Sequence, residues 1–135
     1  VTLISCSGPK LATAAEARDL YTSTLFKKSR GWAEGRGGSW GILSALHGLV
    51  LPGDTLSPYD LRLPSLGRAE RLRWGELVAA QVRREFPGED LTILAGRAYC
   101  DPLKSAGLRF DEPLAGLQIG ERLQWLNSEG AQRRP

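Results

Sequence analysis

The stretch WGILSALHGLVLPGDTLSPYDLRL, residues 40–63, decides the fold and the site that the sequence predicts. Its apolar beginning predicts a buried strand. The remainder sets Ser44, His47, Tyr59 and Asp60 among glycines and prolines, a composition that favours a shaped loop over a helix. Because α/β proteins commonly carry functional side chains on loops that follow buried strands, we expect the active or binding site here.

Short apolar runs and longer segments of helical spacing alternate along the rest of the chain. The patterns predict strands over residues 1–6, 40–45, 91–95 and 108–110, and helices over residues 14–34, 66–86, 99–106 and 121–126. Thr13 with Glu16 is the expected capping box of the first helix, and Ser65 is the expected N-cap of the second. Strands that alternate with helices predict an α/β fold, a three-layer sandwich with a short, mostly parallel sheet of about four strands.

Length and composition indicate an ordinary globular chain. With 135 residues, 41% apolar and 24% charged, we expect a single α/β domain over residues 1–127 and a polar C-terminal tail over residues 128–135. No apolar run approaches the roughly 20 residues that cross a bilayer, and no signal peptide opens the sequence, so no membrane partner is expected. Two cysteines, Cys6 and Cys100, favour a reducing cytoplasm over a disulfide framework or a zinc site. The sequence gives no sign of the oligomeric state.

Polar residues follow three of the predicted strands. Right-handed crossovers bring the carboxyl ends of parallel strands to one rim of the sheet, so these residues are expected to converge. The candidate substrate-binding residues at this rim, including tyrosines that line it, are Ser5, Cys6, Ser7, Lys10, Tyr21, Ser44, Tyr59, Gly96 and Tyr99. This convergence is the strongest argument from sequence for a site.

Several familiar kinds of site are disfavoured. The segment SCSGPK, residues 5–10, lacks the GxxxxGK(S/T) spacing of a nucleotide P-loop, although Lys10 remains a candidate phosphate contact or a solvent-facing lysine. The G-x-S-x-G elbow of serine hydrolases is absent. Cys6 is either a nucleophile or a buried structural thiol. His47 is the only histidine, which excludes a two-histidine metal site and leaves a catalytic or a structural imidazole.

The Pro58-Tyr59-Asp60 turn offers an aromatic ring beside a carboxylate. Tyr59 has the shape to stack on a flat ring, and Asp60 has the chemistry to activate water or to stabilise a developing cation. The alternative is that Asp60 caps a turn or pairs with Arg62. Nothing in the sequence calls for a cofactor or a metal.

The net charge of +3 is unevenly spread. Arg68, Arg71 and Arg73 gather in one predicted helix, where they are candidate contacts to a DNA backbone. A solvated face of an arginine-rich protein is the equally open alternative.

The ordered motifs ISCSGPK, ARDLYTSTLFKKSRGWAE, ILSALHGLVLPGDTLSPYDLRL, ILAGRAY and LAGLQIGERLQWL resemble an uncharacterised domain family of bacteria and phages over nearly the whole chain. The central segment also resembles the YaaA peroxide-stress proteins, which have an L-S-(G/A)-L-(Y/H)-G-(L/V) strand exit and a P-Y turn. That resemblance touches Ser44, His47, Gly48, Pro58 and Tyr59, whereas Asp60 stands where those proteins tend to have arginine. It implies DNA binding and protection from oxidative damage.

Uracil-DNA-glycosylase-like and Rossmann-like domains are similar by architecture. The chain lacks the G-Q-D-P-Y and H-P-S-P motifs of the standard uracil-DNA glycosylases. The favoured hypothesis is a DNA N-glycosidase of repair or modified-base processing, with Asp60 stabilising the oxocarbenium-like sugar, His47 assisting the departing base, and Tyr59 or Tyr99 stacking on it. The alternatives are a non-catalytic DNA-binding protein of the oxidative-stress or DNA-damage response and a small nucleotide or nucleoside hydrolase.

Overall fold

A mixed four-stranded sheet forms the centre of the fold in the computed structural model, which describes residues 1–6 and 8–132. Strand β1 (Thr2–Ser5) lies between β3 (Trp40–Ser44) and β6 (Thr92–Leu94) and is parallel to both. Strand β4 (Gly48–Val50) pairs antiparallel with β3 and completes the order β4-β3-β1-β6. The predicted α/β fold with a short, mostly parallel sheet is confirmed.

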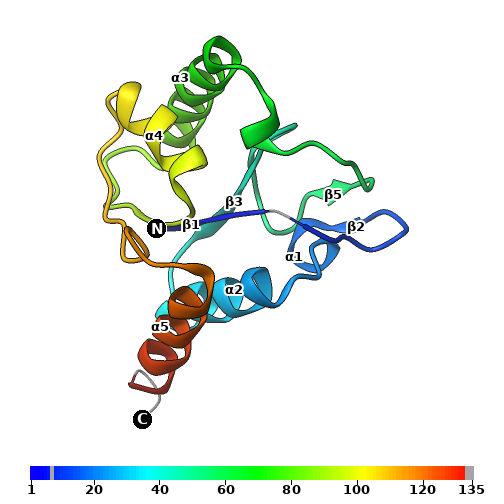
Figure 1. Cartoon of the computed structure of the whole chain (residues 1–135), viewed down its shortest axis with the longest axis vertical. Helices are drawn as coiled ribbons and strands as arrows, with labels where there is room; N and C mark the ends of the chain where they lie inside the picture. Colours follow the sequence, from blue (N-terminus) through cyan, green and yellow to red (C-terminus); the bar gives the residue numbers. More distant parts are fainter. Residues whose placement is uncertain (7, 133–135) are drawn as a thin grey trace.

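Helices cover both faces of this sheet (Figure 1). The helices are α1 (Ala17–Leu20), α2 (Thr24–Arg36), α3 (Arg68–Glu85), α4 (Arg97–Ser105) and α5 (Ile119–Gln132), with a 3-10 turn η1 (Leu63–Ser65) and a small ribbon of β2 (Ala15–Glu16) and β5 (Thr55–Leu56). Successive residues of β1 serve opposite faces, as the pleat of a strand requires. Leu3 packs in the core under α3 and α4, and Ile4 packs in the core under α2 and α5. Three layers result.

The helix predicted over residues 14–34 is wrong as a single element. The chain breaks between α1 and α2, where Tyr21 has an extended backbone (φ −89°, ψ 129°) and forms an isolated β-bridge with Lys10. Helix α2 then begins anew after Ser23, whose hydroxyl accepts the Phe26 N–H at 3.1 Å. Ser23, rather than Thr13, is therefore the side-chain N-cap.

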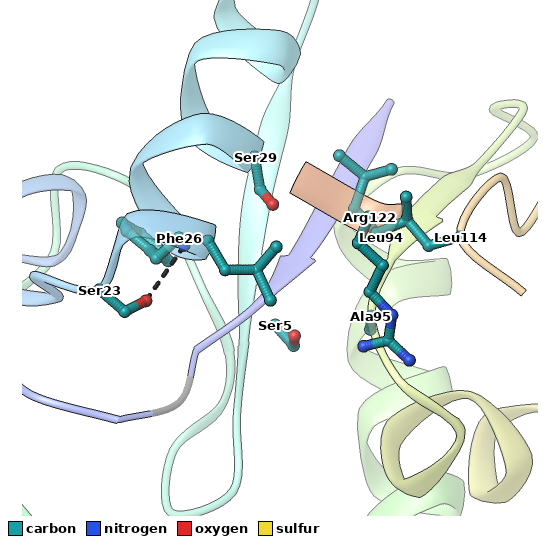
Figure 2. Close-up of a pocket in the computed structure, with 9 residues that line it drawn as sticks. Ser5, Ser23, Phe26, Ser29, Leu94, Ala95, Leu114 and Arg122 are labelled. Carbon is teal, nitrogen blue, oxygen red and sulfur yellow. Dashed lines mark hydrogen bonds between the residues drawn. The ribbon is translucent and has the colours of Figure 1, made fainter. Parts of the chain in front are cut away.

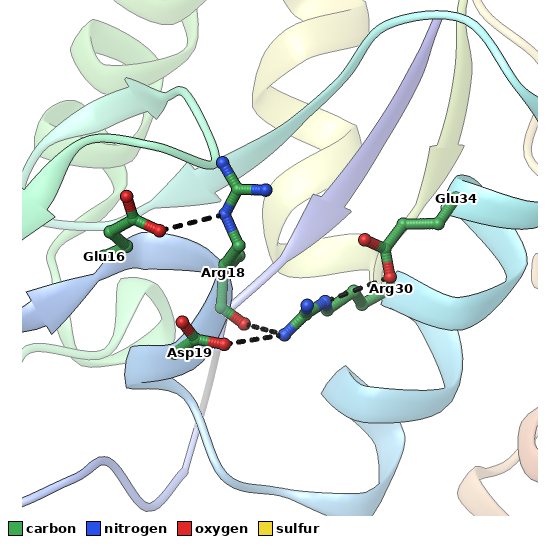
Figure 3. Close-up of polar contacts among 5 residues, drawn as sticks. All are labelled: Glu16, Arg18, Asp19, Arg30 and Glu34. Carbon is green, nitrogen blue, oxygen red and sulfur yellow. Dashed lines mark hydrogen bonds and ion pairs between the residues drawn. The ribbon is translucent and has the colours of Figure 1, made fainter.

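Arg30 fastens the two helices across this break (Figure 3). Its Nη1 donates to the Arg18 carbonyl at 2.6 Å and lies 3.1 Å from an Asp19 carboxylate oxygen, while its Nε lies 3.1 Å from Glu34. A separate ion pair joins Arg18 to Glu16 at 3.3 Å. The end of α1 is thus held against α2 by charge-assisted hydrogen bonds.

Four further predictions are corrected. The loop predicted after β3 contains β4, so β3 continues through a turn at residues 45–47 into a β-hairpin. Residues 108–110 form no strand, and an isolated bridge joins Thr92 to Asp111 instead. Helix α3 starts two residues later than predicted, with Gly67 rather than Ser65 at its N-cap. Helix α5 runs on to Gln132, so residues 127–132 are helical, and residues 133–135 lie outside the described part of the chain. No helix among the described residues has the length and apolar character needed to cross a membrane.

Candidate functional site

The hydroxyl of Tyr59 joins three buried side chains at the carboxyl ends of β1 and β3. It lies 2.7 Å from the Tyr21 hydroxyl, 2.6 Å from Ser44 Oγ and 3.2 Å from Cys6 Sγ. These three partners are at most 4% exposed, whereas Tyr59 is half-buried. The structure therefore brings together four of the residues that the sequence placed at the rim. We call this group, Cys6, Tyr21, Ser44 and Tyr59, the tyrosine cluster.

Neighbouring backbone groups fix the tyrosine cluster in place. Ser44, the last residue of β3, accepts the His47 N–H at 3.1 Å through its hydroxyl, and its carbonyl accepts the Trp74 indole N–H at 3.0 Å. Cys6 follows β1, and its thiol donates to the Leu43 carbonyl at 3.2 Å. Tyr99 of α4 donates its hydroxyl to the Cys6 carbonyl at 2.9 Å. Strands, loop and helices are thus tied together at one point.

The phenols at this site are neutral at physiological pH. Burial raises the pKa of Tyr21, Tyr59 and Tyr99, and the adjacent Cys6 sulfur adds to the effect for each. A phenol with a raised pKa keeps its proton and donates hydrogen bonds. The tyrosines therefore position neighbouring groups and do not act as bases.

Stability should fall steeply in alkali. In the unfolded chain the three phenols ionise near pH of about 10, whereas the fold keeps them protonated to higher pH. The contribution is full below that pH and is lost as pH rises, by up to about 1.4 kcal/mol per pH unit for each tyrosine. Urea unfolding followed at increasing pH measures this slope, and Tyr21→Phe should make it shallower. A stability that stays constant above the ordinary tyrosine pKa would contradict the burial of the phenols.

Tyr21 and Tyr59 should be energetically coupled. Among the described residues, Tyr59 is the hydrogen-bond partner of the Tyr21 hydroxyl, which is 1% exposed. Tyr59→Phe removes the partner that lies 2.7 Å from that buried hydroxyl and should cost about 1–3 kcal/mol. Tyr21→Phe/Tyr59→Phe should cost less than the sum of the single changes by about 1 kcal/mol, measured by urea unfolding of all four proteins. Additive costs would mean that the two phenols do not share a hydrogen bond.

Two polar side chains flank the ring of Tyr59. Lys10 Nζ lies 4.5 Å from the ring centroid and also donates to the Gly8 carbonyl at 3.3 Å. The His47 imidazole meets the same ring edge-on, with 5.1 Å between centroids, and is exposed to solvent. The tyrosine cluster thus presents a cation and an imidazole at its solvent side.

Asp60 is exposed beside the tyrosine cluster. Within residues 1–6 and 8–128, no group forms a hydrogen bond or ion pair with its carboxylate. The pairing with Arg62 that the sequence left open is therefore not formed. The carboxylate is free to meet a ligand.

A metal centre has no support in the described part of the chain, where no three His, Cys, Asp or Glu side chains gather as ligands.

The chain matches the model of a family of unknown function, DUF6884, over residues 1–128. It belongs to that family. No curated protein matches the chain.

Two of the other predicted site residues of this DUF6884 chain, Ser5 and Gly96, lie apart from the tyrosine cluster. Ser5 lines a separate small cavity between β1 and β6, and Gly96 lies at the start of α4, where the guanidinium of Arg122 approaches it (Figure 2). Ser7 falls outside the described residues. Tyr99 is buried at 6% exposure with its ring edge-on to Trp74, so it does not offer a face for stacking on a base.

The predicted DNA contacts of the DUF6884 chain divide between two surfaces. Arg68 and Arg71 line an open hollow of about 530 Å³ between α3 and α4, together with Arg97. Arg73 instead lines a hollow with His47 and Glu70. Sequence reasoning did not select Arg97 as a DNA contact, and it missed Arg122, which stands in no pattern that marks its surface.

Proposed function

We propose that this chain hydrolyses the N-glycosidic bond of a base in DNA at the rim beside Tyr59. The observation that supports this most is that Tyr59 is held through its hydroxyl while two exposed polar residues, Asp60 and His47, lie beside it. Asp60 follows it in the chain with a free carboxylate, and His47 packs against its ring. A carboxylate and an imidazole held beside an immobilised tyrosine suit the hydrolysis of a glycosidic bond.

The proposed reaction needs few groups. As the bond to the base breaks, the sugar acquires oxocarbenium character, which the Asp60 carboxylate stabilises while it accepts a proton from the attacking water. The water oxygen bonds to the sugar carbon, and the base departs with the bonding electron pair and takes a proton from solvent water, while Asp60 later returns its proton to solvent. His47 donates a hydrogen bond to the departing base. Lys10 lies close enough to this rim to attract a phosphate of the substrate.

Base release is the direct test of the proposal. Purified protein is incubated with duplex and single-stranded DNA that carries uracil, oxidised or hypermodified bases, and with the free nucleosides. Abasic sites are then detected by strand cleavage in alkali. Release from DNA supports the proposal, and release from free nucleosides alone would replace it by a small nucleoside hydrolase. Binding without any release would favour the second candidate.

That second candidate is a non-catalytic DNA-binding protein. It is favoured by the hollow that Arg68, Arg71 and Arg97 line, where Asp101 is the sole acidic residue, and by the resemblance of the central segment to YaaA. Arginines on an open surface suit phosphate contacts that are independent of base sequence.

Arg68→Gln should weaken DNA binding at every sequence and reduce the slope of log K against log salt by about 1. Arg73→Gln is the matched control, since it removes the same exposed charge from α3 but on the other hollow. Fluorescence anisotropy with labelled DNA at several salt concentrations measures both variants. Equal effects would mean that binding responds to net charge and not to the α3–α4 hollow.

A further inference from the structure

A second polar cavity lies across β1 from the tyrosine cluster, at the carboxyl ends of β1 and β6 (Figure 2). From β1 the chain crosses by α2 to β3, on one face of the sheet, and it later reaches β6 by α3, on the other face. The gap between β1 and β6 is therefore the point where the connections diverge to opposite faces. Ligands of open α/β sheets bind outside the strand ends at such a point.

The lining of this cavity is suited to an anion. Ser5 of β1, Ser23 and Ser29 of α2, and Arg122 of α5 contribute its polar groups, and no carboxylate lines it. Arg122 donates its Nε to the Leu117 carbonyl at 2.9 Å, which leaves the two terminal nitrogens of the guanidinium for another acceptor.

Ser29 gives an independent sign of a ligand. Its side chain is 3% exposed, and within the described residues its hydroxyl has no hydrogen-bond partner. Figure 2 shows the hydroxyl oxygen directed into the cavity. A hydroxyl that has no partner from the protein, in so buried a residue, leaves a place for an acceptor or donor of a bound molecule.

Two helix ends add favourable partial charge. Helix α2 begins at the cavity, where Ser23 is its N-cap, and Leu25 and Phe26 of its first turn line the wall. Helix α4, nine residues long, begins after Gly96, next to the lining residue Ala95, and has no side-chain cap. Backbone amides at helix N-termini attract negative charge.

We infer that this cavity binds the terminal phosphate of a phosphomonoester. The cavity is narrow, about 10 Å³, which is the room that one water molecule takes. In the proposed complex one phosphate oxygen takes this room, and the remaining oxygens lie outside it, on the side of Arg122. An internal phosphodiester is too broadly substituted to enter. The inference stands without the proposed glycosidase activity, because it uses none of the same side chains.

The test is titration of the full chain with inorganic phosphate, a nucleoside 5′-monophosphate and the matching nucleoside at constant ionic strength, followed by calorimetry and by amide NMR. We expect both phosphates to bind with a Kd of about 1 mM or below. We expect the nucleoside not to bind. Shifts should concentrate at the first turns of α2 and α4. A nucleoside that binds as well as its monophosphate, or phosphate that acts no differently from chloride, would overturn the inference.

Two variants and a control sharpen the test. Arg122→Gln should raise the Kd for phosphate about tenfold, and Ser29→Ala about fivefold. Ser29→Ala should not lower the melting temperature without phosphate, because the lost hydroxyl had no partner. Arg84→Gln removes a charge from the last turn of α3, near the opposite end of the strands, and should leave the Kd unchanged. Equal affinity in all three variants and the parent would contradict the site.

Discussion

Asp60→Asn is expected to reduce base release by about 10²- to 10⁴-fold, the loss typical of a general acid or base. Asparagine has the same shape, but it neither accepts the proton of water nor carries the charge that stabilises an oxocarbenium ion. Because Asp60 is exposed and its carboxylate holds no hydrogen bond among the described residues, folding should change by less than about 0.5 kcal/mol. Single-turnover rates of abasic-site formation measure the activity, and the melting temperature measures the fold.

Asp54→Asn provides the matched control for this loss. Asp54 lies in the same segment and is also exposed, but its carboxylate accepts the Leu51 N–H at 2.9 Å and so shapes the turn. That variant should lose some stability and keep its rate of base release. An Asp60→Asn protein that releases bases at the parent rate would remove Asp60 from the mechanism. Unchanged DNA affinity in Asp60→Asn would separate catalysis from binding.

The central strands could be predicted because strands buried on both faces appear in the sequence as short apolar runs. Strands of a parallel sheet covered by helices are mostly apolar on both faces, and β1, β3 and β6 follow that pattern with a serine or threonine only at their ends. The convergence of their carboxyl ends follows from crossover handedness alone. The sequence could therefore predict that Cys6 and Ser44 lie at one rim, and the hydrogen bonds of Tyr59 to both confirm it.

The break between α1 and α2 at Tyr21 could not be predicted from the local sequence pattern. Helical spacing continues across it, and no proline or glycine interrupts residues 15–30. What ends α1 there is long-range: the backbone of Tyr21 bridges Lys10, and its hydroxyl reaches Tyr59. Tertiary contacts outweigh a helix propensity that differs by only tenths of a kcal/mol per residue, about 0 to 0.7 for ordinary residues.

The second cavity was equally hidden. Ser29 sits inside a helical segment, and Arg122 follows Glu121 in a helix far along the chain, so neither stands beside a strand end in sequence. Their meeting depends on α2 and α5 packing together over one face of the sheet, which the contact between the Trp32 and Trp125 rings, 5.4 Å between centroids, reflects. A helix-to-helix contact of this kind has no local sequence signal.

Gly75→Ala is expected to destabilise the fold by about 3 kcal/mol, the upper part of the range for an overpacked contact. Gly75 lies in α3 where that helix meets α4. A Cβ at this position would stand 2.5 Å from the Pro102 carbonyl carbon and 2.7 Å from its Cβ. These are main-chain and ring-anchored atoms that cannot turn aside, so α4 itself must shift. The gain of about 1 kcal/mol in helix propensity from glycine to alanine is too small to offset this clash.

Gly31→Ala is the control that separates the steric clash at Gly75 from the gain in helix propensity. Gly31 lies inside α2, and a Cβ there would meet nothing within 4 Å, so alanine should stabilise that variant by about 0.5–1 kcal/mol. Urea unfolding of both variants should therefore give changes of opposite sign in the free energy of unfolding.

Helix α4 also carries Tyr99, whose hydroxyl donates to the Cys6 carbonyl. The shift of α4 forced by Gly75→Ala should therefore reach the tyrosine cluster and slow base release as well. If Gly75→Ala and Gly31→Ala both stabilise the protein, then α3 and α4 leave room for a methyl group. The packing of α4 on α3 would then not be what holds the tyrosine cluster in place.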